Sequence, residues 1–141
     1  MMELRDAGKT RSIGVSNFHP HHFEELVKDG GAMPSVNQIK LGPGLIQKEI
    51  VTYCRDRDIV LTAYSPLGKA HGLDDPTVKK IAESHGKTSA QIVLRWSLQM
   101  GFIPLPRSSN EGRIKENADL FGFQLSNEEM EELLNLGGFM G

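Results

Sequence analysis

Two arginines and a serine lie close together in the stretch FIPLPRSSNEGRIKENADLF (102–121), as Arg107, Ser108 and Arg113. The sequence predicts that a helix begins within this stretch, and the first turn of a helix offers free backbone N–H groups and the positive end of the helix dipole. Guanidinium groups add the paired hydrogen bonds that suit a phosphate. A solvated basic loop is the alternative, but these residue types at this place favour a phosphate-binding loop.

Polar side chains also lie toward the ends of three other predicted strands. They are Ser16 and Asn17, Gln38, and the segment 64–68. In parallel α/β folds, ligands bind at the carboxyl ends of the strands, so these positions are candidate ligand contacts. Taken one at a time, each also has a structural explanation as a turn, a satisfied polar residue in a strand, or a core aromatic residue.

The elements that would position these side chains alternate between strand and helix. Between the strands lie amphipathic helical patterns, among them Phe23, Leu26 and Val27, and capping boxes begin two later helices at Thr88 and Ser126. This order, β-α-β-α-β-(αα)-β-α-α, requires parallel pairing and predicts one α/β domain over residues 1–141. The strands are apolar runs bounded by Gly, Pro or Asn, which is typical of strands covered on both faces, and they span 11–17, 35–41, 58–67 and 101–106.

Four β/α units leave two architectures open. An eight-stranded (β/α)8 barrel needs about 250 residues, and this sequence has 141. Four parallel strands could instead form a small doubly wound domain, whose open sheet edges must be covered or paired. The residue pattern therefore predicts either that domain or half of a barrel.

Composition excludes several classes of protein. Apolar residues make up 38% and charged residues 24% of the sequence, as in globular proteins, and a net charge of −2 without a basic block argues against a nucleic-acid partner. No apolar run is long enough to span a membrane and the N-terminus does not resemble a signal sequence, so we expect a cytoplasmic location. Cys54 is the only cysteine, and His19, His21 and His22 lack matching ligands, so we expect no metal site.

Four motifs, in this order and spacing, resemble the C-terminal half of an aldo-keto reductase: GKTRSIGVSNF, SVNQIKL, IVLTAYSPLG and IPLPRSSNEGRIKENADLF. The resemblance extends from about Leu4 to Leu136. It implies strands five to eight of a TIM-type (β/α)8 barrel. It also implies an oxidoreductase that uses NADPH to reduce aldehydes and ketones.

The resemblance assigns the nicotinamide end of the cofactor to the first three motifs. Ser16, Asn17 and Gln38 match residues that hydrogen-bond the nicotinamide carboxamide. Tyr64 matches the tyrosine that stacks on the nicotinamide ring.

The resemblance assigns the phosphate and adenine groups to two loops and a helix. Ser65, Leu67 and Gly68 match the loop around the pyrophosphate. Arg107 stands where the family commonly has lysine, and two arginines near the ribose 2′-phosphate favour NADPH over NADH. The resemblance gives five residues to the 2′-phosphate and adenine: Arg107, Ser108, Arg113, Glu116 and Asn117.

The family's catalytic Asp, Tyr, Lys and His all belong to the first half of the barrel, so we expect no catalytic residue in this chain. Tyr53 falls on a predicted helix and Tyr64 is the stacking residue, so neither replaces the catalytic tyrosine. We therefore expect an NADP(H)-binding half-barrel that acts on a carbonyl substrate only when a complementing half-barrel or a second copy completes it. The alternative is a non-catalytic module that self-associates or binds nucleotide weakly.

Overall fold

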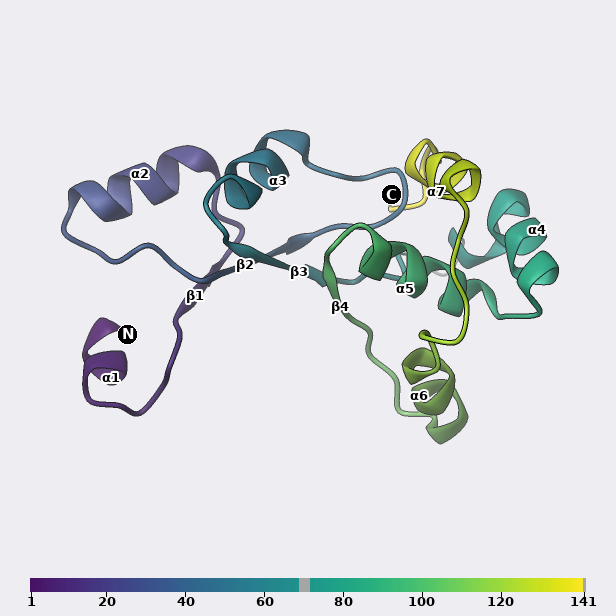
Figure 1. The fold of residues 1–141 in the computed structure, drawn as a ribbon, viewed down its shortest axis with the longest axis horizontal. Coiled ribbons are helices and arrows are strands. Elements are labelled where there is room, and N and C mark those ends of the chain that lie inside the picture. Colours follow the sequence, from purple (N-terminus) through teal and green to yellow (C-terminus); the bar gives the residue numbers. More distant parts are fainter. Residues whose placement is uncertain (69–71, 141) are drawn as a thin grey trace. The chain divides into compact units, whose positions relative to one another are not determined.

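The computed structural model describes residues 1–68 and 72–140, and the statements below concern these residues. Strands and helices alternate through most of this part of the chain (Figure 1). The elements are α1 (Met2–Asp6), β1 (Gly14–Ser16), α2 (Pro20–Lys28), β2 (Val36–Lys40), α3 (Lys48–Arg55), β3 (Val60–Tyr64), the 3-10 helix η1 (Gly72–Asp74), α4 (Pro76–His85), α5 (Ser89–Gln99), β4 (Ile103–Leu105), α6 (Glu111–Ala118) and α7 (Asn127–Leu134).

The strands form one sheet in chain order, β1-β2-β3-β4. β1 pairs with β2 in parallel, in a register that places Val15 beside Asn37 and Ser16 beside Gln38. Sequential parallel strands joined by helices are the arrangement that the alternating pattern predicts. The predicted α/β class is therefore confirmed, and each observed strand lies inside the range expected for it.

The two capping boxes predicted from the sequence are confirmed. Thr88 and Gln91 form a capping box at the start of α5, and Ser126 and Glu129 form another at the start of α7. Gly86 ends α4 in the left-handed conformation, with φ of 59°. These features depend on residues a few positions apart, which is why the sequence reveals them.

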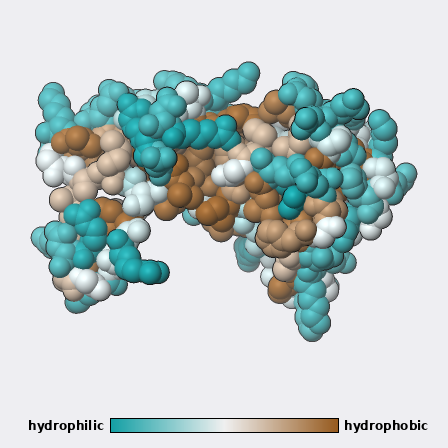
Figure 2. All heavy atoms as spheres, viewed as in Figure 1, coloured by the Kyte–Doolittle hydropathy of each residue, from teal (hydrophilic) through white to brown (hydrophobic). Residues whose placement is uncertain are grey.

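Two expectations about burial are wrong. Val27, expected on the inner face of α2, is 45% exposed, whereas Phe23 is fully buried and Leu26 is half-buried. Strand β4 is not covered on both faces, since Ile103 and Leu105 remain 47% and 43% exposed among the described residues. Figure 2 shows hydrophobic side chains at the surface along the strands.

Contacts divide the chain into two compact units, which are described separately. Unit 1 comprises Met1–Ile39 and Gln47–Thr62. Its helices α2 and α3 lie beside each other (Figure 1), and the rings of Phe23 and Tyr53 stack at 5.3 Å between them. Cys54 on α3 is fully buried.

Unit 2 comprises Lys40–Ile46 and Ala63–Gly141. Its core is centred on α5, whose Trp96 is fully buried and donates its indole N–H to the carbonyl of Met130 at 3.2 Å. Leu133 of α7 is also fully buried. Within the described residues of the chain, no helix is long and apolar enough to cross a membrane.

A contact between His85 and Glu129 joins α4 to α7 within unit 2. His85 Nε2 lies 2.9 Å from Glu129 Oε1, and the backbone N–H of Ser126 donates to Oε2 of the same carboxylate at 2.8 Å. Burial alone would raise the pKa of Glu129, but hydrogen bonds from Ser126 and His85, together with the charge of His85, outweigh it and leave this pKa below its ordinary value. The carboxylate therefore stabilises the fold in its ionised form.

We expect Glu129→Gln to lower the free energy of unfolding by about 0.5–1.5 kcal/mol near neutral pH, because the amide keeps the capping oxygen but loses the charge. A carboxyl group with a lowered pKa stabilises the folded state fully above its unfolded-state pKa, and this contribution disappears as the pH falls through the folded-state value. Urea unfolding at about pH 6.5 and about pH 3.5 should therefore show a smaller deficit at the lower pH.

The matched control is Glu128→Gln, which removes a carboxylate from the same first turn of α7 but from an exposed position. It should lose less stability than Glu129→Gln. Equal losses in the two variants, or a Glu129→Gln deficit that is no smaller at the lower pH, would contradict the assigned role of the His85 contact.

Candidate functional site

The ends of β1 and β2 bring together three of the predicted site residues in unit 1. The Ser16 hydroxyl donates to the carbonyl of Gln38 at 2.9 Å, and the backbone N–H of Asn17 donates to the same oxygen at 3.0 Å. Asn17 has a φ of 57°, in the left-handed region that asparagine tolerates better than most residues. Ser16, Asn17 and Gln38 therefore form one local cluster, as the parallel register requires.

Residues 64–68 leave the end of β3 in a tight turn in unit 2. Tyr64 is the last residue of the strand and is half-buried. The backbone N–H of Gly68 donates to the carbonyl of Ser65 at 3.0 Å, and both residues have positive φ, 63° and 49°. The turn exposes Ser65 and holds Leu67 beside the cavity described next.

A cavity of about 760 Å³ in unit 2 gathers most of the remaining predicted residues. Its wall is formed by the loop after β4, by α6, by the first residues of α5 and by η1 and α4. Six of the predicted cofactor contacts line it: Leu67, Arg107, Ser108, Arg113, Glu116 and Asn117. Tyr64, Ser65 and Gly68 do not line this cavity.

The cavity carries an excess of positive charge. Arg107, Arg113 and Lys79 contribute three cations, against the carboxylates of Asp74 and Glu116. Lys79 Nζ lies 2.8 Å from Asp74 Oδ1, so the charges of these two residues neutralise each other. Within the described residues neither guanidinium takes part in an ion pair, which suits the binding of an anion.

Hydrogen bonds fix the helix that carries Arg113. Asn110 is the N-cap of α6, and its side-chain oxygen accepts from the backbone N–H of Arg113 at 3.0 Å. Ser108 Oγ accepts from the backbone N–H of Asn110 at 3.1 Å. The loop and the first turn of α6 are thus ordered before any ligand binds, which lowers the entropy cost of binding.

The other end of α6 is tied to α5. Gln91 is buried, and its Nε2 donates to the carbonyls of Glu116 at 3.2 Å and Asp119 at 3.1 Å. The Lys87 ammonium lies 2.8 Å from Asp119, and its hydrogen bond and charge hold the pKa of that carboxyl below its usual value. The cavity wall formed by α6 is therefore anchored at both ends.

The sequence reading missed the part of the cavity wall that lies before β4. Lys79 and Asp74 read only as charged residues near a helix start, and no local pattern distinguishes them from solvated ones. Thr88 was recognised as a helix cap but not as part of a ligand site. Only the tertiary packing of α4 and α5 reveals Leu73, Ser89 and Ala90 as lining residues. Ser109 and Asn110 complete the lining and belong to the loop after β4 that the sequence had already indicated.

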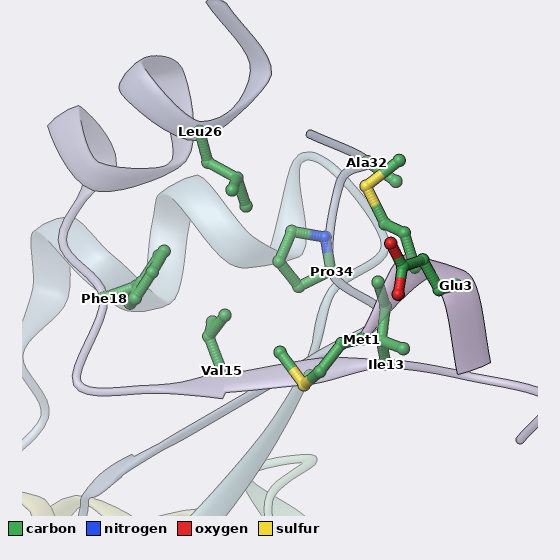
Figure 3. A pocket seen from close by; sticks show the side chains of 10 residues that line it. Met1, Glu3, Ile13, Val15, Phe18, Leu26, Ala32 and Pro34 are labelled. Carbon is green, nitrogen blue, oxygen red and sulfur yellow. The ribbon is translucent and has the colours of Figure 1, made fainter. Parts of the chain in front are cut away.

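A second cavity, of about 490 Å³, lies in unit 1 and is almost entirely apolar. Figure 3 shows Ile13, Val15, Phe18 and Leu26 around it, with the carboxylate of Glu3 at one side. Its strand residues belong to the beginning of β1, whereas ligands of parallel sheets bind at the carboxyl ends. No lysine, arginine or histidine side chain lines it, so it is not the candidate cofactor site.

The histidines near the start of α2 have a structural role. The backbone N–H of His19 donates to His22 Nδ1 at 3.0 Å, and the two residues form a capping box that the sequence reading did not anticipate. Histidine is not among the usual N-cap residues. Among the described residues, no group of three histidine, cysteine or acidic side chains is placed to hold a metal ion.

The chain belongs to the aldo/keto reductase family, whose model matches residues 1–136. It is 50% identical over 131 residues to the glyoxal reductase of Bacillus subtilis, an alignment that covers 93% of this chain and 48% of that protein. The chain spans about half the length of the curated relatives it matches.

Solved structures agree with this assignment. A Gox0644 mutant in complex with NADPH superposes with a TM-score of 0.90 at 41% identity, covering 94% of this chain and 49% of that one. A Bombyx mori aldo-keto reductase in complex with NADP gives a TM-score of 0.87 at 38% identity, with 95% and 47% covered. The fold is thus that of four β/α units of such a barrel.

We expect Gly68→Ala to destabilise the chain more than Gly86→Ala. Both glycines have a positive φ, 63° and 59°, so both variants lose about 1–2 kcal/mol of conformational energy. A Cβ at position 68 would also lie 2.6 Å from the carbonyl oxygen of Phe139, whereas position 86 has open space. Crowding adds about 1–3 kcal/mol for Gly68→Ala alone.

Thermal unfolding of both variants checks this expectation. A larger loss in Gly68→Ala confirms that the turn after β3 needs glycine for space as well as for backbone conformation. Equal losses would mean that the contact with Phe139 does not constrain the turn.

Proposed function

We propose that this chain is the NADP(H)-binding, C-terminal half of an aldo-keto reductase, an oxidoreductase that transfers a hydride from NADPH to an aldehyde or ketone. The observation that carries the proposal is the cavity of unit 2, where Arg107, Ser108 and Arg113 surround the start of α6. Relatives in the same family were solved with NADPH and NADP, which supports the same cofactor here.

The residues of the cavity fit the adenosine end of the cofactor. Its volume lies within the range of typical small-molecule sites, and its excess cations suit the doubly charged 2′-phosphate that distinguishes NADPH from NADH. Arg107 and Arg113 would bind that phosphate with Ser108. Glu116 and Asn117 would contact the adenine edge, and the flat guanidinium of Arg113 would lie against the adenine ring.

The remaining predicted residues would serve the other groups of the cofactor. The turn with Ser65, Leu67 and Gly68 would hold the pyrophosphate, and Tyr64 would stack on the nicotinamide ring. The cluster of Ser16, Asn17 and Gln38 would hydrogen-bond the carboxamide and so select the ring face presented. When bound, the cofactor would supply the hydride.

Carbonyl reduction also needs a proton donor beside the carbonyl oxygen. The resemblance places the catalytic Asp, Tyr, Lys and His of the family in the half of the barrel that this chain does not match. We therefore propose that a complementing half-barrel supplies these residues and the substrate pocket, with no nucleic acid or membrane involved.

A second candidate function is self-association as a non-catalytic module. Ile103 and Leu105 of β4 favour it, because both remain largely exposed on the last strand of the sheet. A sizing column separates the two proposals: a stable dimer that forms without NADPH and binds none of it would support self-association.

The cofactor assignment predicts that NADPH binds more tightly than NADH. It also predicts that Arg107→Ala and Arg113→Ala each reduce this difference in affinity. Removing one charged partner of a phosphate should cost about 1.5–3 kcal/mol, which is roughly ten- to hundred-fold in the affinity for NADPH. The affinity for NADH should change little. Isothermal titration of both cofactors measures the two effects.

Lys115→Ala is the matched control, because it removes a cation from the same helix at an exposed position that pairs with Glu111 and does not line the cavity. It should leave the preference for NADPH intact. Equal affinity of the wild-type chain for both cofactors would show that the phosphate assignment is wrong.

We also expect no measurable carbonyl reduction by the purified chain alone. Addition of a fragment with the first four β/α units of an aldo-keto reductase, such as that of the Bacillus subtilis relative, should restore NADPH oxidation with a simple aldehyde. Turnover is measured by the loss of NADPH absorbance. Turnover by the highly purified chain without that fragment would refute the proposal that the complementing half-barrel supplies the catalytic residues.

A further inference from the structure

We propose that Asn37 is a positioning residue for the nicotinamide end of the cofactor. Its buried side chain clamps the backbone of Phe18 and thereby holds the preceding residue, Asn17, in its left-handed conformation. This inference rests on the proposed function, which gives Asn17 the carboxamide of the nicotinamide.

The position of Asn37 requires an explanation. It is fully buried in the middle of β2, with its side chain on the same face of the strand as Ile39 and on the opposite face from Gln38. A buried amide costs free energy unless it is hydrogen-bonded, and an aliphatic side chain would satisfy a core position without that requirement. The hydrogen bonds of Asn37 therefore indicate what the amide does.

The oxygen and the nitrogen of the Asn37 side-chain amide both hydrogen-bond to the backbone of Phe18. The backbone N–H of Phe18 donates to Asn37 Oδ1 at 3.3 Å, and Asn37 Nδ2 donates to the carbonyl of Phe18 at 2.9 Å. The side chain thus pairs with the backbone much as a neighbouring strand would, two residues beyond Ser16, the last residue of β1 in register with β2. A weaker contact joins Asn37 Nδ2 to Cys54 Sγ at 3.9 Å.

Asn17 is held on both sides by β2: on one side by the backbone of Gln38, and on the other by the side chain of Asn37. The Asn17 N–H donates to the carbonyl of Gln38 at 3.0 Å, which holds the peptide before Asn17. The Phe18 N–H belongs to the peptide after Asn17, and Asn37 holds that one. With both peptide planes tied to β2, Asn17 keeps a φ of 57° that is otherwise unfavourable for a residue with a Cβ.

A purely structural role for Asn37 makes a different prediction. It would stabilise the fold as a whole, and its loss would lower the folded fraction and so weaken the apparent binding of every ligand alike. A positioning role confines the effect to the part of the cofactor that Asn17 contacts. The two roles can be separated with NADPH and 2′-phospho-ADP-ribose, which differs from NADPH by lacking the nicotinamide.

The test is a titration of the full chain with both compounds, for the wild type, Asn37→Leu and Cys54→Ala. Asn37→Leu has a side chain of similar size and removes both bonds to Phe18. We expect it to weaken NADPH binding by about five- to ten-fold and to leave 2′-phospho-ADP-ribose binding within about two-fold. Cys54→Ala removes the weaker contact alone, and should keep the wild-type ratio of the two affinities.

Hydrogen exchange of the wild-type chain provides a second measurement that does not depend on the folding of a variant. NADPH should slow the exchange of the Asn17 and Phe18 amides more than 2′-phospho-ADP-ribose does. Equal slowing by both compounds would overturn the positioning role.

The remaining outcomes are distinct. If Asn37→Leu weakens the binding of both compounds equally, or of neither, the positioning role is wrong while the proposed function stands. If the wild-type chain itself binds the two compounds equally tightly, the assignment of Asn17 to the nicotinamide fails, and the positioning role fails with it.

Discussion

The parallel pairing of β1 with β2 is the constraint on which the candidate site depends. Its register places Ser16 beside Gln38, so that one carbonyl accepts both the Ser16 hydroxyl and the Asn17 N–H. A shift by one residue would exchange the buried and exposed faces of β2 and put Asn37 where Gln38 now lies. The same connection order brings polar residues to the carboxyl ends of the strands, where a cofactor would bind.

Unit 2 builds its own candidate site on a different principle. Its cavity is prepared by side chains that cap and tie helices: Asn110 and Ser108 order the start of α6, and Gln91 holds its end. Hydrogen bonds therefore order the segment that carries Arg107 and Arg113, and neither guanidinium forms an ion pair within the described residues. This arrangement explains how a short loop could select a nucleotide by one phosphate group.

Sequence patterns predicted the local features of the fold and the alternation of strands with helices. The strand order, two capping boxes and the arginine loop follow from patterns within a few residues, and the family resemblance added the role of each site residue. Lys79, the clamp formed by Asn37 and the exposure of Val27 depend on which distant segments pack together. Apolar periodicity shows that a residue can be buried, but not which neighbour covers it.

The central claim is that the cavity around Arg107 and Arg113 binds the 2′-phosphate of the cofactor. A crystal structure of the chain with adenosine 2′,5′-bisphosphate tests it most directly. The account predicts the 2′-phosphate within hydrogen-bonding distance of both guanidinium groups and of the Ser108 hydroxyl. Nucleotide bound elsewhere, or bound in this cavity with its 2′-phosphate directed away from Arg107 and Arg113, would contradict it.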